Sequence, residues 1–313
     1  MEIKNEKIAV LIPCYNEELT IKKVVEDFKK ELKDQNADIY VYNNNSKDKT
    51  AQIAKEAGAI VVDEYKQGKG NVIRSMFRDI DADIYVMVDG DDTYPAEAVH
   101  SLIEEVREGR ADMAIGDRLT NGTYSKENKR HFHDFGNNLV KNSINFLFHS
   151  KLKDIMTGYR VFNRDFVKNF PILSGGFEIE TEMTFHALDR NYRIVEVPIE
   201  YRDRPSGSVS KLNTFSDGFK VLITIFKMYK NYKPFLFFGI IAFLFFIISL
   251  AVGLPLFVEY FKTGIVLKFP RGIVATGLMI CSALSLCVAC ILDTNVTEHK
   301  EVLEILRTIN RKK

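Results

Sequence analysis

The sequence has almost no net charge, and it is poor in the residues that bind transition metals. Its 43 Lys and Arg residues face 42 Asp and Glu residues, which leaves a formal charge of +1. This balance gives no electrostatic reason to expect nucleic acid as a partner. The chain has only 6 histidines and 4 cysteines, and none stands at the spacing of a metal site. We therefore expect the four cysteines to be reduced and structural.

Charge is missing altogether from two stretches near the C-terminus. Residues 234–258 and 272–292 contain no charged side chain. Each run exceeds the roughly 18 residues that indicate a membrane span, and each is apolar on all faces. A pair of buried core helices is the alternative. The positive-inside rule predicts that the large N-terminal part and both termini are cytoplasmic. The basic residues behind this are Lys220, Lys227, Lys230, Lys233, Arg307, Arg311, Lys312 and Lys313, against Lys262, Lys268 and Arg271 between the runs.

The first 120 residues alternate between strand and helix patterns. Apolar β-rich runs are separated by amphipathic segments and by turn residues. Such alternation predicts a mostly parallel sheet covered on both faces, with ligands bound outside the carboxyl ends of the strands. The expected strands are 7–13, 37–43, 59–63, 83–89 and 111–118, and the expected helices are 17–32, 48–58, 70–80 and 95–108.

The pattern is looser after residue 120. Residues 131–150 and 175–191 predict helices, the first with an apolar face of Phe135, Leu139, Phe146 and Leu147, and residues 193–201 predict a strand. Aromatic and aliphatic residues three or four apart then predict an amphipathic helix at the membrane interface, with an ordinary core-facing helix as the alternative. The expected organisation is a large N-terminal domain (1–212), the interfacial helix (213–233), a two-helix membrane region (234–292) and a cytoplasmic C-terminal helix (293–313).

Three carboxylates follow the fourth expected strand. Asp89, Asp91 and Asp92 lie within four residues, and like charges this close raise each other's pKa. We expect a compensating cation, and Mg²⁺ or Mn²⁺ suits carboxylates that share the ion with substrate phosphates. A solvated acidic turn that caps the helix near Pro95 is the alternative.

Other strand ends also carry polar groups suited to a nucleotide. The Gly68-Lys69-Gly70 turn lacks the third glycine of a dinucleotide-binding fingerprint, and no Walker A motif is present. Four consecutive strand ends of this kind make a nucleotide site the better interpretation of the acidic turn. The further groups are Pro13, Asn16 and Glu17 after the first strand, Asn43, Asn44, Ser46, Asp48 and Thr50 after the second, and Lys66 after the third.

Seven motifs in order give a specific resemblance. They are PCYNE, NNNSKDKT, KQGKG, DGDDTYP, GDR, DIMTGYRVF and FEIETEM, spread over Ile8 to Leu212. The sequence resembles family 2 glycosyltransferases of the GT-A fold, in the branch that transfers sugars to polyprenyl phosphate. The resemblance implies an α/β, Rossmann-like catalytic domain on the cytoplasmic membrane face. It also implies inverting transfer from a nucleotide sugar, with UDP-glucose or UDP-N-acetylglucosamine favoured, to undecaprenyl phosphate for cell-envelope glycans.

The resemblance also implies roles for individual residues. Asp91 would be the main ligand of Mg²⁺ or Mn²⁺, and Asp89 would serve ribose and metal together. The family often has two aspartates where this chain has Asn43 and Asn44, although Asn44 retains groups that can hydrogen-bond the base. The remaining assignments are Pro13, Tyr15 and Glu17 to the nucleoside, Lys69 to the donor, Arg118, Arg130, Arg204 and Lys211 to phosphate groups, and Glu178 and Glu182 to sugar hydroxyls or basic residues.

Asp154 matches the position often described as the catalytic base. A sugar hydroxyl acceptor would need such a base. A phosphate monoester has a second pKa near ~6 and is already largely dianionic at neutral pH. We therefore expect Asp154 to orient Arg160 or the acceptor instead of taking a proton. A loop carboxylate paired with Arg160 is the structural alternative.

Other functions remain to be separated from this one. A processive polysaccharide synthase would carry a Gln-x-x-Arg-Trp motif, which a chain without tryptophan cannot contain. A GDP-mannose-dependent enzyme, a silent scaffold that binds nucleotide sugar and a non-enzymatic membrane protein are further alternatives. A homo-oligomer is also open, because small residues in the second apolar run permit close helix packing. They are Gly277, Ser282, Ala283, Ser285 and Ala289.

Overall fold

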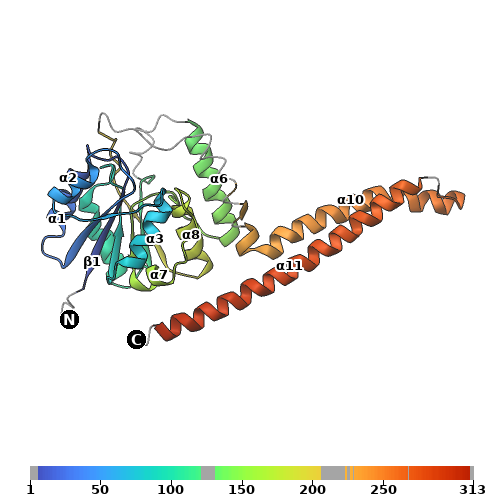
Figure 1. Cartoon of the computed structure of the whole chain (residues 1–313). Coiled ribbons are helices and arrows are strands. Elements are labelled where there is room, and N and C mark those ends of the chain that lie inside the picture. The colour runs from blue at the N-terminus through green and yellow to red at the C-terminus, as the bar shows by residue number, and fades with distance from the viewer. Residues whose placement is uncertain are drawn as a thin grey trace. The chain divides into compact units, whose positions relative to one another are not determined.

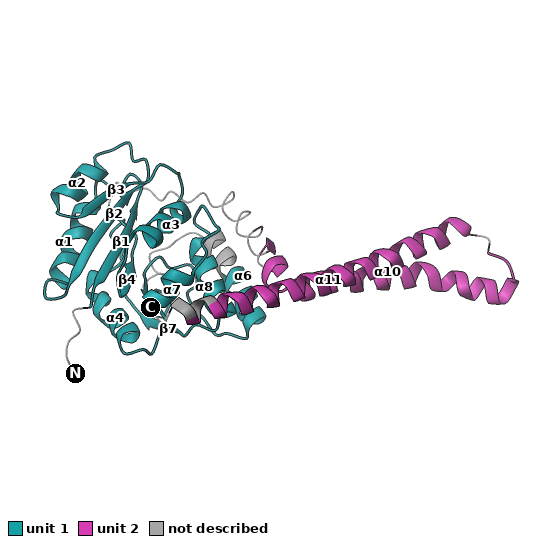
Figure 2. Ribbon diagram, turned by 60° about the horizontal axis from the view of Figure 1, so that its bottom comes forward, with its two compact units in different colours: residues 1–222 teal, residues 223–313 magenta. Residues whose placement is uncertain are grey.

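A computed structural model describes residues 6–120, 131–205, 223, 226–227, 229–266 and 268–310. It divides into two compact units, residues 1–222 and 223–313 (Figure 2). Most of the expected interfacial helix lies outside the described residues, as do Arg130 and Lys211, so these assignments stay predictions.

The first unit is built on one mostly parallel sheet, as the sequence predicts, and this sheet has seven strands (Figure 1). Its order is β3-β2-β1-β4-β6-β5-β7. Strand β1 pairs in parallel with β2 and β4, whereas β6 runs antiparallel to β4 and β5. The strands are β1 (Ile8–Cys14), β2 (Ala37–Asn43), β3 (Ile60–Asp63), β4 (Ile84–Met87), β5 (Met113–Asp117), β6 (Arg160–Asn163) and β7 (Ile194–Pro198).

Helices cover both faces of this sheet, and each face has its own core. Successive side chains of a strand point to opposite faces, so a strand buried on both sides is a continuous apolar run. In β1, Ile8 and Val10 join one core and Ala9 and Leu11 the other. The first core includes side chains of α1 (Ile21–Glu31), α2 (Thr50–Glu56) and α4 (Val99–Arg107). A short 3₁₀ helix, Ala96–Ala98, directly precedes α4. The second core includes side chains of α3 (Lys69–Asp79), α7 (Arg164–Asn169) and α8 (Ile179–Asp189).

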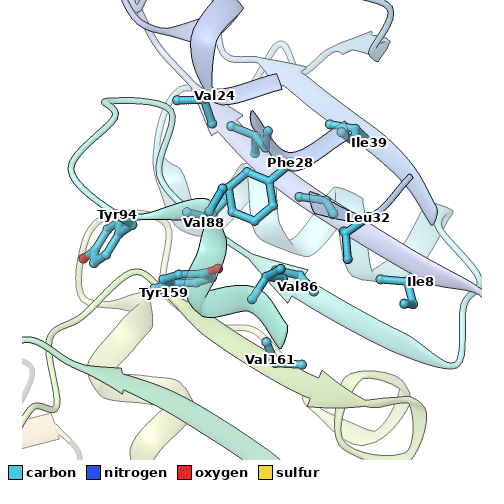
Figure 3. Close-up of a cluster of buried hydrophobic side chains, with 14 of the residues drawn as sticks. Ile8, Val24, Phe28, Leu32, Ile39, Val86, Val88, Tyr94, Tyr159 and Val161 are labelled. Atoms are coloured by element: carbon cyan, nitrogen blue, oxygen red, sulfur yellow. The ribbon is translucent and has the colours of Figure 1, made fainter. Parts of the chain in front are cut away.

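Aromatic rings occupy one edge of the first core (Figure 3). The ring of Tyr159 lies 6.1 Å from that of Phe28 and 5.5 Å from that of Tyr94. Figure 3 shows the Tyr159 hydroxyl directed into the cluster and the Tyr94 hydroxyl directed away from it. The core therefore reaches the residues that directly follow the acidic turn.

Two expectations are wrong in detail. The helix expected over 17–32 begins only at Ile21, so Leu19 precedes α1 and is exposed. Among the side chains of α6 (His131–Phe148) that the structure describes, 138–148, Val140, Ile144 and Leu147 are buried, whereas Leu139 and Phe146 are exposed. Leu147 is thus buried as expected, and the Phe135 side chain lies outside this described range. The buried residues recur at intervals of four and three, so the packed face is rotated from the expected one.

The sequence scheme also lacks β6. This strand has four residues and starts with Arg160, which is completely buried. Its guanidinium donates to the carbonyls of Thr157 and Ile155 and to the Thr184 hydroxyl, at 3.1, 2.5 and 2.9 Å. Because these bonds satisfy the charged group inside the fold, a strand can start at a residue that sequence patterns assign to the surface.

The second unit is a helical hairpin of α10 (Pro234–Thr263) and α11 (Phe269–Asn310). The Ser249 hydroxyl donates to the Ala275 carbonyl at 2.7 Å, and the Ser282 hydroxyl donates to the Ala242 carbonyl at 2.8 Å. Small side chains at the contact let the two backbones approach closely. Both helices are long and apolar enough to cross a membrane, by length and composition. All four cysteines lie among the described residues, and none of them forms a disulfide.

Candidate active site

The carboxyl ends of β1 and β2 bring two loops together. The backbone N–H groups of Asn16 and Glu17 donate to the hydroxyls of Ser46 and Thr50, at 2.9 and 2.8 Å. The Asn16 side chain accepts from the N–H of Lys47 at 2.7 Å. Polar residues that sequence alone suggests for a nucleotide therefore hold these loops to each other. Pro13, Tyr15 and Glu17 lie at this edge and are half-buried, so each keeps a partly accessible surface.

Asn44 has a structural role that differs from the expected contact with a base. Its side-chain NH₂ donates to the carbonyls of Glu64 and Lys66, at 3.0 and 2.7 Å. Its side-chain oxygen accepts from Gln67 at 3.2 Å and from the N–H of Gly68 at 2.7 Å. An asparagine amide has two donor hydrogens and two acceptor positions, and all four are used. Asn44 thus fixes the loop that precedes α3.

That loop packs directly on the backbone of a second loop. A Cβ atom at Gly68 would lie 2.1 Å from the carbonyl oxygen of Gly175, and one at Gly70 would lie 2.2 Å from that of Ser174. Glycine is required at both positions because backbone atoms cannot yield as a side chain can. Glu182 holds the second loop, accepting from the N–H groups of Leu173 and Ser174 at 2.9 and 2.8 Å. Glu182 therefore holds this loop in place, and its expected contact with sugar hydroxyls or basic residues stays a prediction.

Lys69 stands between these glycines and connects two carboxylates. Its ammonium group lies 2.5 Å from Asp89 and 2.5 Å from Glu180. Burial raises the pKa of Glu180, although Lys69 opposes that effect. Burial opposes the charge of Lys69 too, yet the two carboxylates raise the pKa of Lys69 above its ordinary value. Lys69 therefore stays protonated and supplies a positive charge at the N-terminus of α3.

The sequence interpretation missed Glu180. It placed Glu178 and Glu182 in the site and put Glu180 on another face of the helix. Helix α8 has buried residues on all sides, so no polar face distinguishes one glutamate from the next. The available signal was the lysine between two glycines, because a buried cation needs an anionic partner. Glu178 is half-buried beside Gly176.

Each carboxylate of the acidic turn has its own cation within the protein. Asp89 pairs with Lys69, Asp91 with Arg204, and Asp92 with Lys23 at 2.7 Å. Asp91 also accepts from the Thr93 hydroxyl at 2.6 Å. Burial, and then the charge of Asp89, raise the pKa of Asp91.

Asp92 does not cap the following helix, contrary to expectation. Its backbone is left-handed, with φ of 58°, and its side chain is held by Lys23 of α1. The 3₁₀ helix that starts at Ala96 has Pro95 at its N-cap and no side-chain cap. Asp92 therefore ties the acidic turn to α1.

Asp154 pairs with Arg118 and not with Arg160. The Arg118 guanidinium donates two hydrogen bonds to the Asp154 carboxylate, at 2.7 and 2.9 Å. Burial alone would raise the pKa of Asp154, but Arg118 outweighs burial and holds that pKa below its ordinary value. Arg160 binds the groups named above, and burial lowers its pKa to about 10. The expected Asp154–Arg160 pair is therefore wrong, and Arg160 has a structural place in the sheet.

Tyr94 connects this ion pair to the acidic turn. Its hydroxyl accepts from the N–H of Gly158 at 2.9 Å and lies 3.4 Å from the Arg118 guanidinium. A Cβ atom at Gly158 would lie 2.3 Å from a carboxylate oxygen of Asp89, so this backbone borders Asp89 directly. The Tyr201 ring packs on Tyr94, with 5.9 Å between centroids. Tyr94 and the Gly158 backbone thus connect the Arg118–Asp154 ion pair to Asp89 of the acidic turn.

The donor set suits a divalent ion that arrives with a phosphate ligand. Among the described residues, no group of three or more His, Cys, Asp or Glu side chains could hold a metal. Mg²⁺ is commonly bound by one or two carboxylates, with water and substrate phosphates in its other positions. Asp89 and Asp91 fit that incomplete set, and they do not make a closed site built by protein alone.

Comparison with known proteins identifies the family. Residues 9–170 match the profile of Glycosyl transferase family 2. The chain belongs to this family. This glycosyltransferase is 32% identical to "Glycosyltransferase AglJ" of Haloferax volcanii over 259 residues, which cover 82% of each chain. It is 30% identical to the "Dolichyl-phosphate hexose transferase" of the same organism over 223 residues, 71% of this chain and 94% of that one.

Solved structures show the same fold. The crystal structure of Mycobacterium tuberculosis glucosyl-3-phosphoglycerate synthase superposes on the glycosyltransferase with a TM-score of 0.59. The match has 20% sequence identity and covers 71% of this chain and 80% of that one. That synthase has been crystallised with UDP and Mn²⁺. At this identity the likeness shows the shared GT-A-like fold.

Proposed function

We propose that this glycosyltransferase moves a hexose from a UDP-sugar, UDP-glucose or UDP-N-acetylglucosamine, to polyprenyl phosphate. The product is a polyprenyl-phosphate sugar with inverted anomeric configuration. A relative named for dolichyl-phosphate hexose transfer supports the acceptor, and UDP in the crystals of the mycobacterial synthase supports the nucleotide. The two long apolar helices suit an enzyme whose acceptor resides in a bilayer.

The observation that carries this proposal is the Arg118–Asp154 ion pair. A general base needs a pKa near the operating pH, and the pKa of Asp154 is lowered by Arg118. A carboxylate held in this way is poorly suited to deprotonate a sugar hydroxyl. A phosphate acceptor has no such requirement, since its second pKa lies near ~6. Its oxygen can bond to the anomeric carbon while the bond to the diphosphate breaks, with no proton transferred.

The donor diphosphate is assigned to the edge formed by Lys69, Asp89, Asp91 and Arg204. Lys69 and Arg204 supply positive charge there, and both are held by carboxylates. When bound at Asp89 and Asp91, Mg²⁺ or Mn²⁺ would neutralise charge on the diphosphate as a Lewis acid. The cations that now face the two aspartates would then be released toward the phosphates.

We also propose that α10 and α11 span the cell membrane, with the catalytic unit and both termini in the cytoplasm. Both helices are long and apolar enough, and basic residues are more numerous outside the hairpin than in its connection. The domain boundaries at 212, 233 and 292 belong to this proposal. A cysteine-accessibility assay tests the orientation, because residues of the connection, such as Ile265, should be labelled only from outside.

The test uses the purified full chain in detergent with a panel of UDP- and GDP-sugars. We expect release of UDP that depends on both undecaprenyl phosphate and a divalent metal, and a lipid-linked sugar of inverted configuration. Undecaprenol, which lacks the phosphate, is the matched control and should give no release. Release from GDP-mannose alone would contradict the donor assignment. Transfer to a sugar hydroxyl, or no release with any donor, would contradict the proposed reaction.

A further inference from the structure

A pocket with an excess of positive charge lies beside the Arg118–Asp154 ion pair. Two of its lining residues, Asn138 and Lys141, come from α6, and Lys153 comes from the loop that leads to Asp154. Arg118 and Asp154 form part of the same wall. The pocket therefore joins a helix and a loop that the sequence motifs do not connect.

The charges of this pocket are not all available to a ligand. Arg118 donates two hydrogen bonds to Asp154, so these two charges neutralise each other. Lys141 has no hydrogen bond or ion pair within the described residues. Lys153 donates to the Thr120 hydroxyl at 3.1 Å, and that hydroxyl donates in turn to the Asp117 carboxylate, but Lys153 forms no direct ion pair among the residues that the structure describes. Two positive charges consequently remain for a ligand.

Glu196 does not cancel this excess. Its carboxylate accepts from the backbone N–H groups of Lys153 and Asp154, at 2.8 and 2.9 Å. It is not one of the lining residues of the pocket. Glu196 thus fixes the loop backbone, while the Lys153 side chain keeps its charge for the pocket.

We infer that Lys141 and Lys153 hold the phosphate of the acceptor in this pocket. Two lysines that form no direct ion pair with any described residue match a phosphate monoester dianion in charge, and the Asn138 amide adds hydrogen-bond donors. Arg118 then acts as a positioning residue for Asp154, whereas the resemblance assigned it to a phosphate. The inference rests on the proposed function, because it places the acceptor of that reaction.

The activity test compares lysines in the pocket with a lysine outside it. Lys141→Met and Lys153→Met should each raise the KM for undecaprenyl phosphate about tenfold, the effect of losing one charged hydrogen bond. The KM for the UDP-sugar should stay unchanged. Lys151→Met is the matched control, since Lys151 is exposed, lies two residues from Lys153 and does not line the pocket. The conservative variants Lys141→Arg and Lys153→Arg should retain most of the affinity for undecaprenyl phosphate.

A binding test without donor separates this inference from the proposed function. Inorganic phosphate and undecaprenyl phosphate are titrated against the full chain, the Lys141→Met/Lys153→Met double variant and Lys151→Met. Weaker binding of both ligands only in the double variant supports the pocket, and unchanged binding overturns it. Thermal unfolding of each variant confirms that it is folded.

The two ligands also distinguish a lipid headgroup from a free phosphate. At least tenfold tighter binding of undecaprenyl phosphate assigns the pocket to the lipid, and equal affinity overturns the acceptor assignment. Normal acceptor KM in the double variant would refute the inference and leave the reaction intact. Absence of any transfer by the wild type would refute the reaction, and the phosphate titration would still decide the pocket.

Discussion

The ammonium group of Lys69 lies 2.5 Å from the buried carboxylate of Glu180 and also 2.5 Å from the carboxylate of Asp89. Two carboxylates share one cation, and only Asp89 is partly accessible at the edge of the sheet. We interpret Glu180 as the permanent partner and Asp89 as the exchangeable one. Lys69 can then turn toward a diphosphate without leaving an unpaired buried charge.

Glu180→Gln should weaken donor use because Gln keeps the shape but cannot hold the lysine by charge. We expect kcat/KM for the UDP-sugar to fall about 10- to 100-fold, the range for a lost charged hydrogen bond. The KM for the lipid should not change. Glu105→Gln is the control, since Glu105 pairs with Arg110 on an exposed surface. Equal losses in the two variants would remove Glu180 from the site.

The fold was largely predictable from the sequence because its main signals are local. Strand β1 is an apolar run between polar turns, and helices α1 and α3 each have their buried residues at helical spacing. Strand β6 was not predicted because it is short and starts at a charged residue, and part of what satisfies Arg160, the Thr184 hydroxyl, lies 24 residues away along the chain.

The candidate site was predictable as a region and less so in its pairings. The motifs assign Asp89, Asp91, Lys69 and Asp154 to one site. In the structure Lys69 pairs with Asp89, and the hydroxyl of Tyr94 lies 3.4 Å from Arg118, the partner of Asp154, while the roles of these residues stay predictions. Sequence reasoning could not find the partners of Asp154 and Asn44, because both depend on the final packing. The ion pair of Asp154 spans 36 residues, and the hydrogen bond from Gly68 to the Asn44 side chain spans 24. A sequence does not distinguish side chains that hydrogen-bond within the protein from side chains that are available to bind a ligand.

Asp91→Asn should abolish activity while making the protein more stable to heat. The folded protein raises the pKa of Asp91, mainly by burial. A carboxyl with a raised folded-state pKa contributes stability below its unfolded-state pKa, and that contribution is lost as pH rises through the folded-state pKa. At neutral pH the ionised group therefore opposes folding, and the neutral isostere removes this effect. Thermal unfolding without metal measures it.

The same variant tests the metal assignment, with Asp92→Asn as its matched neighbour. Mn²⁺ binding in the presence of UDP, followed by electron paramagnetic resonance, should be lost in Asp91→Asn. Asp92→Asn should retain binding, because Asp92 pairs with Lys23 and points to α1. Alanine at each of the three aspartates should rank activity loss with Asp91 worst and Asp92 mildest. Equal losses at Asp91 and Asp92 would mean that the ligand is misassigned.

The pH dependence of transfer should follow the acceptor and not Asp154. Arg118 holds the pKa of Asp154 below its ordinary value, so this carboxylate stays ionised throughout the neutral range. The rate should fall as pH drops below ~6, where the acceptor phosphate takes up its second proton. Asp154→Asn should lower the maximal rate at neutral pH and leave the decline of the rate at acidic pH unchanged. If that acidic decline vanished in Asp154→Asn, base catalysis by Asp154 would be established.

The stability of the Arg118–Asp154 pair gives an independent check. A carboxylate with a depressed folded-state pKa contributes stability above its unfolded-state pKa and loses it as pH falls through the folded-state pKa. Asp154→Asn should therefore lower the melting temperature at pH 7, and the difference from wild type should shrink only below about pH 4. A difference that disappeared between pH 6 and 7 would contradict the assigned pKa direction.

Two tyrosines in contact should respond in opposite ways to loss of the hydroxyl. The Tyr94 hydroxyl accepts from the N–H of Gly158, whereas the buried Tyr159 hydroxyl has no hydrogen-bond partner in the described part of the chain. Tyr94→Phe leaves that N–H unsatisfied, which costs about 1–3 kcal/mol. Tyr159→Phe removes an unpaired polar group from the core of Figure 3 and should leave the melting temperature unchanged or higher.

Activity then separates a packing effect from a positioning effect. The Gly158 backbone borders Asp89, so Tyr94→Phe should lower kcat about tenfold beyond its effect on folding, by the loss of one oriented hydrogen bond. It should do so at temperatures where the variant is fully folded, with little change in KM for the donor. Tyr159→Phe is the internal control and should keep wild-type kcat. If both variants kept wild-type kcat, the hydroxyl of Tyr94 would matter for stability alone, and the acidic turn would hold its geometry without it.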